Sequence, residues 1–177
     1  MQFEFVKVVT HPIAVVYPVI RDDMASLLPW LPGIDRVEVL ERDAEVDGTH
    51  RVLNKWHGTA DSAPPSLRKF VNKDMVTWLD HALWIDAKTR VEWRMETIKF
   101  KGLYECSGVN YWEDLGDGTT RMRITGDLLI YPDKIPGVPK FLAKKLAPKV
   151  EAFLTDAITP NMSAMPDAIQ RYLDEKA

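Results

Sequence analysis

Asp80 and Asn110 are the residues most able to do chemistry, because the strand pattern places both polar side chains on an otherwise apolar sheet face. A carboxylate in such surroundings must be hydrogen-bonded, or its pKa must rise. The pair could therefore orient the polar end of a bound molecule, and Asp80 could serve as a general base. The alternative is that both side chains meet only backbone groups or water, as most buried polar groups do.

The histidines and the single cysteine suggest neither a metal site nor a reactive nucleophile. His50 and His57 are seven residues apart, which puts them on opposite faces of one strand, and no H-x-H or H-E-x-x-H spacing occurs. His57 follows Trp56 and could face a pocket or lie at a strand end. Cys106 has no histidine fixed beside it, which is typical of a buried structural thiol. Because phosphate-binding and nucleotide-binding motifs are also absent, we expect no cofactor and no metal.

The composition is that of a soluble globular protein. The chain has 177 residues, of which 46% are hydrophobic, and its 23 basic and 26 acidic side chains leave a formal charge of −3. This charge does not favour a nucleic-acid partner, since nucleic-acid binding usually needs a basic face. One cysteine cannot form an intrachain disulfide, and the sequence contains no signal-like segment and no apolar run of membrane-spanning length. We therefore expect one cytoplasmic domain over residues 1–177.

A sheet must position Asp80 and Asn110. Strands are predicted at 2–9, from 34 to a turn at 43–48, and at 50–58, 74–85, 89–98, 102–114 and 119–131. Two short helices, at 13–21 and 24–28, separate the first two strands, and residues 60–73 form a long loop. The turns that join the last four strands are too short for crossovers, so these strands form an antiparallel meander.

The turn lengths also predict which residues of the meander face each other. The predicted pairs are Trp84–Val91, Ala82–Trp93, Asp80–Met95, Met95–Cys106, Trp93–Gly108, Val91–Asn110, Trp112–Met122, Asn110–Ile124, Gly108–Gly126, Cys106–Leu128 and Tyr104–Ile130. This register leaves one face apolar and puts Glu92, Arg94 and Arg123 on the other, so the apolar face needs a cover. Apolar residues recur at spacings of three and four from 150 to 173, which predicts one long helix, kinked at its prolines, as that cover.

The segment LPWLPGIDRVEVLE, residues 28–41, is too apolar for an ordinary loop, and its two prolines forbid a regular helix. The run Trp30-Leu31-Pro32-Gly33-Ile34, followed by VEVLE and Gly48, is similar to the W-x-P-G-V…V-E-V-L…G pattern of the START-like (SRPBCC, Bet v 1-like) superfamily, which includes polyketide cyclases, ubiquinone-binding proteins and lipid-transfer proteins. This resemblance, together with the order of the elements, implies an α+β helix-grip fold. In that fold a curved antiparallel sheet of about seven strands wraps around a long C-terminal helix, and two short helices follow the first strand.

The resemblance also implies an internal cavity between sheet and helix that holds an apolar molecule. The apolar corner would form one lip of the cavity mouth, with Trp30 and Leu31 turned inward. The residues predicted to line the cavity are Trp30, Trp56, Trp78, Asp80, Trp84, Trp93, Met95, Asn110, Ile124, Phe153 and Ala157.

Three functions fit this cavity and sheet. The first is binding or transport of a hydrophobic small molecule, such as a lipid, an isoprenoid or a polyketide. The second is an enzyme of the polyketide cyclase or aromatase type, in which Asp80, His57 or Tyr104 moves protons. The third is a co-chaperone-like interaction domain that uses the outer face of the sheet. We favour binding, because the sequence shows no convergent acid–base pair.

A basic amphipathic stretch precedes the apolar stripe of the long helix. Its lysines alternate with apolar residues: Lys140, Lys144, Lys145 and Lys149 with Phe141, Leu142 and Leu146. Such a stretch could make transient contact with a membrane surface, which would suit a lipid carrier. The alternative is an ordinary solvated helix face, which lysines commonly cover.

Overall fold

The computed structural model describes residues 1–44, 47–59, 76–98, 102, 104–131, 134 and 140–177. The side chains of 44, 140–144, 146–147, 149–151, 153–154 and 156–157 lie outside this description. Within the described residues, seven strands form one antiparallel sheet in the order β1-β7-β6-β5-β4-β3-β2. The strands are β1 (Gln2–Val9), β2 (Ile34–Ala44), β3 (Thr49–Gly58), β4 (Thr77–Ile85), β5 (Arg90–Thr97), β6 (Tyr104–Asp114) and β7 (Thr120–Ile130).

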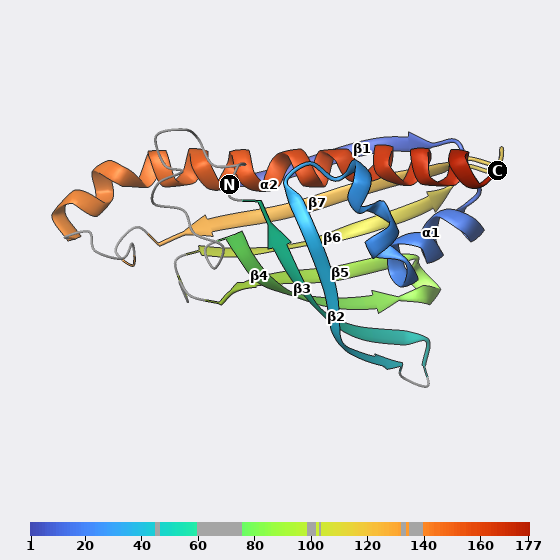
Figure 1. Ribbon diagram of the computed structural model, residues 1–177, viewed down its shortest axis with the longest axis horizontal. Helices are drawn as coiled ribbons and strands as arrows, with labels where there is room; N and C mark the ends of the chain where they lie inside the picture. The colour runs from blue at the N-terminus through green and yellow to red at the C-terminus, as the bar shows by residue number, and fades with distance from the viewer. Residues whose placement is uncertain (45–46, 60–75, 99–101, 103, 132–133, 135–139) are drawn as a thin grey trace.

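Apart from a short 3₁₀ helix in the connection between β4 and β5, the helices lie together on one face of the sheet (Figure 1). The helices are α1 (Ile13–Asp22), the 3₁₀ helices η1 (Met24–Trp30) and η4 (Asp86–Lys88), and α2 (Lys140–Lys176). The long helix α2 runs beside β1 and β7 and also contacts α1 and η1. These elements and their order confirm the predicted α+β helix-grip fold. The second short helix is a 3₁₀ helix rather than an α-helix, and it contains Pro29, which cannot donate a backbone hydrogen bond.

The predicted register of the meander is confirmed at all of the predicted pairs. Short turns fix it: Thr89 closes the β4–β5 connection with a left-handed backbone (φ 42°), and Gly118 does the same before β7 (φ 83°). Because side chains alternate between faces, a fixed register also fixes which residues face α2. The long helix is continuous through Pro148, Pro160 and Pro166.

An aromatic cluster anchors α1 to the sheet. Trp84 on β4 stacks on Trp112 of β6, with ring centroids 5.6 Å apart, and Tyr17 of α1 meets both rings edge-on at 5.5 and 5.2 Å. All three side chains are buried. Such aromatic pairs each contribute about 0.5–1.5 kcal/mol beyond the burial of their area. The cluster therefore holds α1 against one end of the sheet.

Asp86 extends this anchor at the end of β4. Its carboxylate accepts hydrogen bonds from the Tyr17 hydroxyl (3.0 Å) and the Arg21 guanidinium (2.8 Å), and His50 Nε2 lies 3.0 Å from it. Although partial burial raises the pKa of the Asp86 carboxyl, these hydrogen bonds hold the pKa below its usual value. Arg21 also pairs with Asp22, so a chain of charges ties α1 to β4.

We expect Asp86→Asn to lower the free energy of unfolding by about 1–2 kcal/mol, because three hydrogen bonds lose their charge. Urea unfolding at pH 7 measures this loss. Glu113→Gln is the matched control: Glu113 pairs with Arg121 at an exposed site, where an ion pair contributes about 0–1 kcal/mol. Equal losses in both variants would contradict an anchoring role for Asp86.

Candidate functional site

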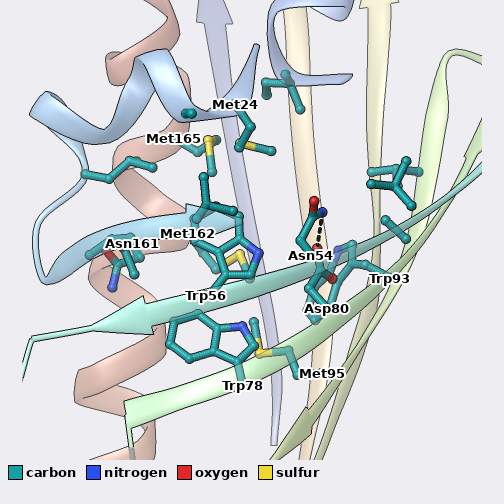
Figure 2. Close-up of a pocket in the computed structure, with 18 of the residues that line it drawn as sticks. Met24, Asn54, Trp56, Trp78, Asp80, Trp93, Met95, Asn161, Met162 and Met165 are labelled. Carbon is teal, nitrogen blue, oxygen red and sulfur yellow. Dashed lines mark hydrogen bonds between the residues drawn. The ribbon is translucent and has the colours of Figure 1, made fainter. Parts of the chain in front are cut away.

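A cavity lies between the inner face of the sheet and the helices (Figure 2). Its volume is about 230 Å³. Strands β2 to β6 supply the sheet side, α1 and η1 supply one edge, and α2 closes the site with Ile158, Asn161, Met162 and Met165. Most of the lining is aromatic or aliphatic, so the cavity is suited to a molecule that is largely apolar.

Asp80 is the carboxylate of this cavity. It lies on β4 opposite Asn54 of β3, and the Asn54 amide donates to its Oδ2 at 3.2 Å. Burial raises the pKa of the Asp80 carboxyl to about 6, although hydrogen bonds from Asn54 and Trp56 and the charge of His81 partly oppose the shift. Near neutral pH the group therefore exchanges between an acid and a base while it faces the cavity.

Two tryptophans stand beside this carboxylate. Trp56 and Trp78 are direct cross-strand neighbours, and their rings lie parallel, 1° apart in plane with centroids separated by 6.1 Å. Figure 2 shows the stacked pair next to Asp80. Trp56 is buried, whereas Trp78 is partly accessible. The two rings thus form a flat aromatic wall of the cavity next to the Asp80 carboxylate.

Asn110 and Tyr104 add polar groups from β6. The side-chain oxygen of Asn110 accepts a hydrogen bond from the Trp93 indole at 2.9 Å, which fixes that ring. Asn110 therefore partners Trp93, and Asp80 partners Asn54, so the predicted pair of Asp80 and Asn110 does not act as a hydrogen-bonded unit. Burial raises the pKa of the Tyr104 hydroxyl, and no hydrogen bond joins that hydroxyl to another described residue.

Seven of the eleven residues predicted for the cavity line it: Trp56, Trp78, Asp80, Trp84, Trp93, Met95 and Asn110. Two do not. Ile124 is 1% exposed and packs within the core, and Trp30 turns to α2, where it meets Tyr172 edge-on with centroids 6.4 Å apart. The side chains of Phe153 and Ala157 lie outside the described residues. A ligand-binding role for any of these positions stays a prediction.

The apolar corner does lie at the edge of the cavity. Leu31, Gly33 and Ile34 line it, and Gly33 has a positive φ of 75°, which lets the chain turn from η1 into β2. The prediction that Trp30 turns inward with Leu31 is wrong for Trp30, because only Leu31 does so. The Trp30 side chain instead packs against Tyr172 and so connects the corner to α2.

Three other predicted groups lie away from the cavity or outside the described side chains. His57 is on the opposite face of β3, where its Nε2 lies 2.5 Å from Glu38 Oε1, so it does not line the cavity. Cys106 is buried at 1% exposure, and burial raises the pKa of its thiol to about 12, as expected for a structural thiol. In the basic stretch, Lys145 is exposed, while the side chains of Lys140 and Lys144 lie outside the described residues.

Sequence reasoning predicted a helix side of the cavity at Phe153 and Ala157, but it missed Asn54 and the four residues of α2 that line the cavity. Asn54 faces Asp80 only through the register of β3 on β4, and no tight turn joins these strands in sequence. The cross-strand pair Trp56–Trp78 carries the signal that could have revealed this register, because aromatic side chains commonly face each other across antiparallel strands. Met162 and Met165 belong to the apolar stripe predicted over residues 150–173, but the stripe did not show that they line the cavity.

The fold is the helix-grip fold, which this chain shares with several solved structures. No family model matches the chain, and no curated protein matches it in sequence. Among solved structures, the Zhui aromatase/cyclase from a Streptomyces species is 17% identical with a TM-score of 0.66, covering 98% of this chain and 95% of its own.

A protein from Thermus thermophilus is also 17% identical, with a TM-score of 0.68 over 100% of this chain and 99% of its own. A START superfamily protein from Mycobacterium smegmatis is 12% identical with a TM-score of 0.51, covering 99% of each chain. At these identities the likeness establishes the fold.

Membrane-spanning and metal-binding features are both missing from the described part of the chain. There, no helix is both long and apolar enough to cross a membrane. Nor do three His, Cys, Asp or Glu side chains gather among those residues as a metal-binding group.

Proposed function

We propose that the protein binds a small, largely apolar molecule in the cavity between the sheet and α2, with Asp80 and Asn54 orienting its polar group. The observation that carries this proposal is the lining itself, in which a few polar side chains interrupt aromatic and aliphatic walls. Sites of this composition are typical of small-molecule binding. Likeness in fold to an aromatase/cyclase and to a START superfamily protein supports the same interpretation.

The size of the cavity narrows the ligand class. Its volume of about 230 Å³ exceeds the roughly 150 Å³ of an engineered cavity that holds benzene. It falls below the range of roughly 300–1,000 Å³ typical of drug-sized ligands. A compound of one or two rings therefore suits the site better than a long-chain lipid or isoprenoid.

Native mass spectrometry of freshly purified protein tests this proposal. We expect a bound small molecule, and we expect Ala82→Leu to reduce its retention about tenfold or more, because Ala82 lines the cavity and the larger side chain fills it. Val6→Leu is the control, since Val6 is 54% exposed on β1 and its enlargement leaves the cavity unchanged. Undiminished retention in Ala82→Leu would contradict binding at this site.

A second candidate is an enzyme of the cyclase or aromatase type. The observation that favours it is a carboxyl with a pKa of about 6 that faces the same cavity as the partly buried Tyr104. A group with such a pKa is suited to proton transfer at neutral pH. With short aromatic polyketide analogues as substrates, Asp80→Asn should abolish turnover while binding persists, and unchanged turnover would exclude this role.

A further inference from the structure

The charge of Asp80 is not neutralised within the described part of the protein. Its hydrogen-bond partners, Asn54 and Trp56, are neutral donors, and the only charged group that acts on it there is His81. Side chains alternate along a strand, so His81 points to the opposite sheet face, where its Nε2 lies 3.1 Å from Glu96 Oε2. Asp80 therefore faces the cavity as a partly buried carboxylate, and among the described residues no cation on its own side of the sheet pairs with it.

The two arginines that line the cavity do not fill this role. Arg21 and Arg42 both bind Asp22, at 2.8 and 2.7 Å, and Arg21 also binds Asp86. Neither arginine forms an ion pair with Asp80. The positive charges of the described lining are thus already paired at the α1 edge, away from the carboxylate.

Aromatic rings border the same carboxylate. Trp56 hydrogen-bonds to Asp80, and Trp78 precedes Asp80 by two residues on the same face of β4. Trp93 lies on the neighbouring strand, and Figure 2 shows it beside Asp80 and Asn54. The faces of tryptophan rings carry negative potential and attract cations within about 6 Å of the ring. The carboxylate therefore gives this part of the cavity a negative potential, to which a ring adds where its face, rather than its N–H edge, borders the cavity.

We propose that the molecule bound in this cavity is an organic cation, an aromatic amine or ammonium compound whose charged nitrogen sits against Asp80 and the tryptophans Trp56 and Trp78. This inference rests on the proposed function and names its ligand class. The cation would supply a counter-charge that none of the described residues gives this partly buried carboxylate on its own face of the sheet, and its ring would occupy the apolar remainder of the cavity. A neutral ligand of the same shape leaves Asp80 desolvated and unpaired, which is unfavourable.

Two probes of equal shape separate charge from size. Phenyltrimethylammonium and tert-butylbenzene differ only in the charge and identity of one central atom. By isothermal titration calorimetry at pH 8, we expect the cation to bind at least about tenfold more tightly than the hydrocarbon. Equal or weaker binding of the cation would overturn this inference and leave the proposed function standing. Binding of neither probe would contradict both.

Asp80→Asn tests the residue itself. This variant keeps the size of the side chain and removes its charge, so tert-butylbenzene should bind it at least as tightly as it binds the native protein. The cation should lose about tenfold or more in affinity. Asp127→Asn, which removes a carboxylate that is 61% exposed and outside this cavity, is the control and should change neither affinity. Native affinity for the cation in Asp80→Asn would overturn the assignment.

The pH dependence gives an independent readout, because a quaternary ammonium cannot lose a proton. The cation should bind more weakly as the pH falls from 8 to 5, since protonation then removes the Asp80 charge. The other ionisable groups on the described lining are Arg21, Asp22, Asp23, Arg42 and Tyr104. The pKa values of Asp22 and Asp23 are lowered, and that of Tyr104 is raised, away from this window. A flat pH profile, or one retained in Asp80→Asn, would overturn the proposal.

Discussion

Gly108→Ala should destabilise the protein by about 3 kcal/mol or more, and this is the largest effect that we expect from one added methyl group. Gly108 lies on β6 between Trp93 of β5 and Gly126 of β7. A Cβ atom there would stand 2.0 Å from the backbone oxygen of Thr125 and 2.5 Å from Trp93 Cζ2. Because a backbone carbonyl in a paired strand cannot move aside, β6 and β7 would have to separate. Urea unfolding followed by circular dichroism measures the loss.

Gly126→Ala provides the control, because the group that would clash with the new methyl group is a side chain and can be replaced. A Cβ atom at position 126 would meet the ring of Phe3, with Cζ at 2.2 Å, which is the far end of a side chain. Adding Phe3→Leu should therefore restore part of the stability lost in Gly126→Ala. No side-chain replacement should do so for Gly108→Ala. A loss below about 1 kcal/mol in Gly108→Ala would contradict the register of the central strands.

Asp80→Asn should stabilise the protein, relative to the native sequence, by roughly 2 kcal/mol more at pH 8 than at pH 4. The folded-state pKa of about 6 lies above the usual value of 3.8. Well below pH 3.8, Asp80 is protonated in both the folded and the unfolded chain and has no effect. As the pH rises, the unfolded chain releases this proton first, so native stability falls until the folded protein also ionises near pH 6. Asparagine does not titrate and escapes this loss.

Unfolding in urea at several pH values between 4 and 8 checks this expectation. The ligand must be removed first, because a bound cation would stabilise the ionised carboxylate and hide the effect. Asp86→Asn is the matched control, for which the stability difference from the native protein should change with pH in the opposite direction. The pKa of Asp86 is lowered in the folded protein, so its charge stabilises the fold at neutral pH and that benefit disappears as the pH falls. A pH-independent difference for Asp80→Asn would show that Asp80 is solvated.

The register of the meander is the feature that sequence reasoning determined best. Tight turns allow few pairings, and the period-two alternation then assigns each side chain to one face. This alternation predicts Asp80, Trp93 and Asn110 on the inner face, and the structure has all three lining the cavity. The apolar stripe of α2 could be predicted equally well, because a helix that covers a sheet must keep its apolar residues on one side.

The direction of the Trp30 side chain and the hydrogen-bond partner of Asp80 could not be predicted from the neighbouring sequence. Trp30 lies in a corner where apolar and polar residues follow no repeating pattern. The position of its ring depends on the contact with Tyr172, which lies on a helix far away in the chain. Asn54 reaches Asp80 because β3 pairs with β4, two strands too far apart in the sequence for the length of their connection to predict the register. Ile124 shares the inner face but packs in the core, since the cavity does not extend beneath every strand.

The sequence by itself therefore determined the order of the elements, the facing residues of the hairpins and the apolar cover, because each depends on contacts within one element or across one short turn. Only the tertiary structure decided that Asp80 meets Asn54 and Trp56, that Trp30 packs against Tyr172, and that a cavity of about 230 Å³ lies between the sheet and the helices. These features depend on how distant elements pack, and packing is set by the shapes of side chains that meet only after the whole chain has folded.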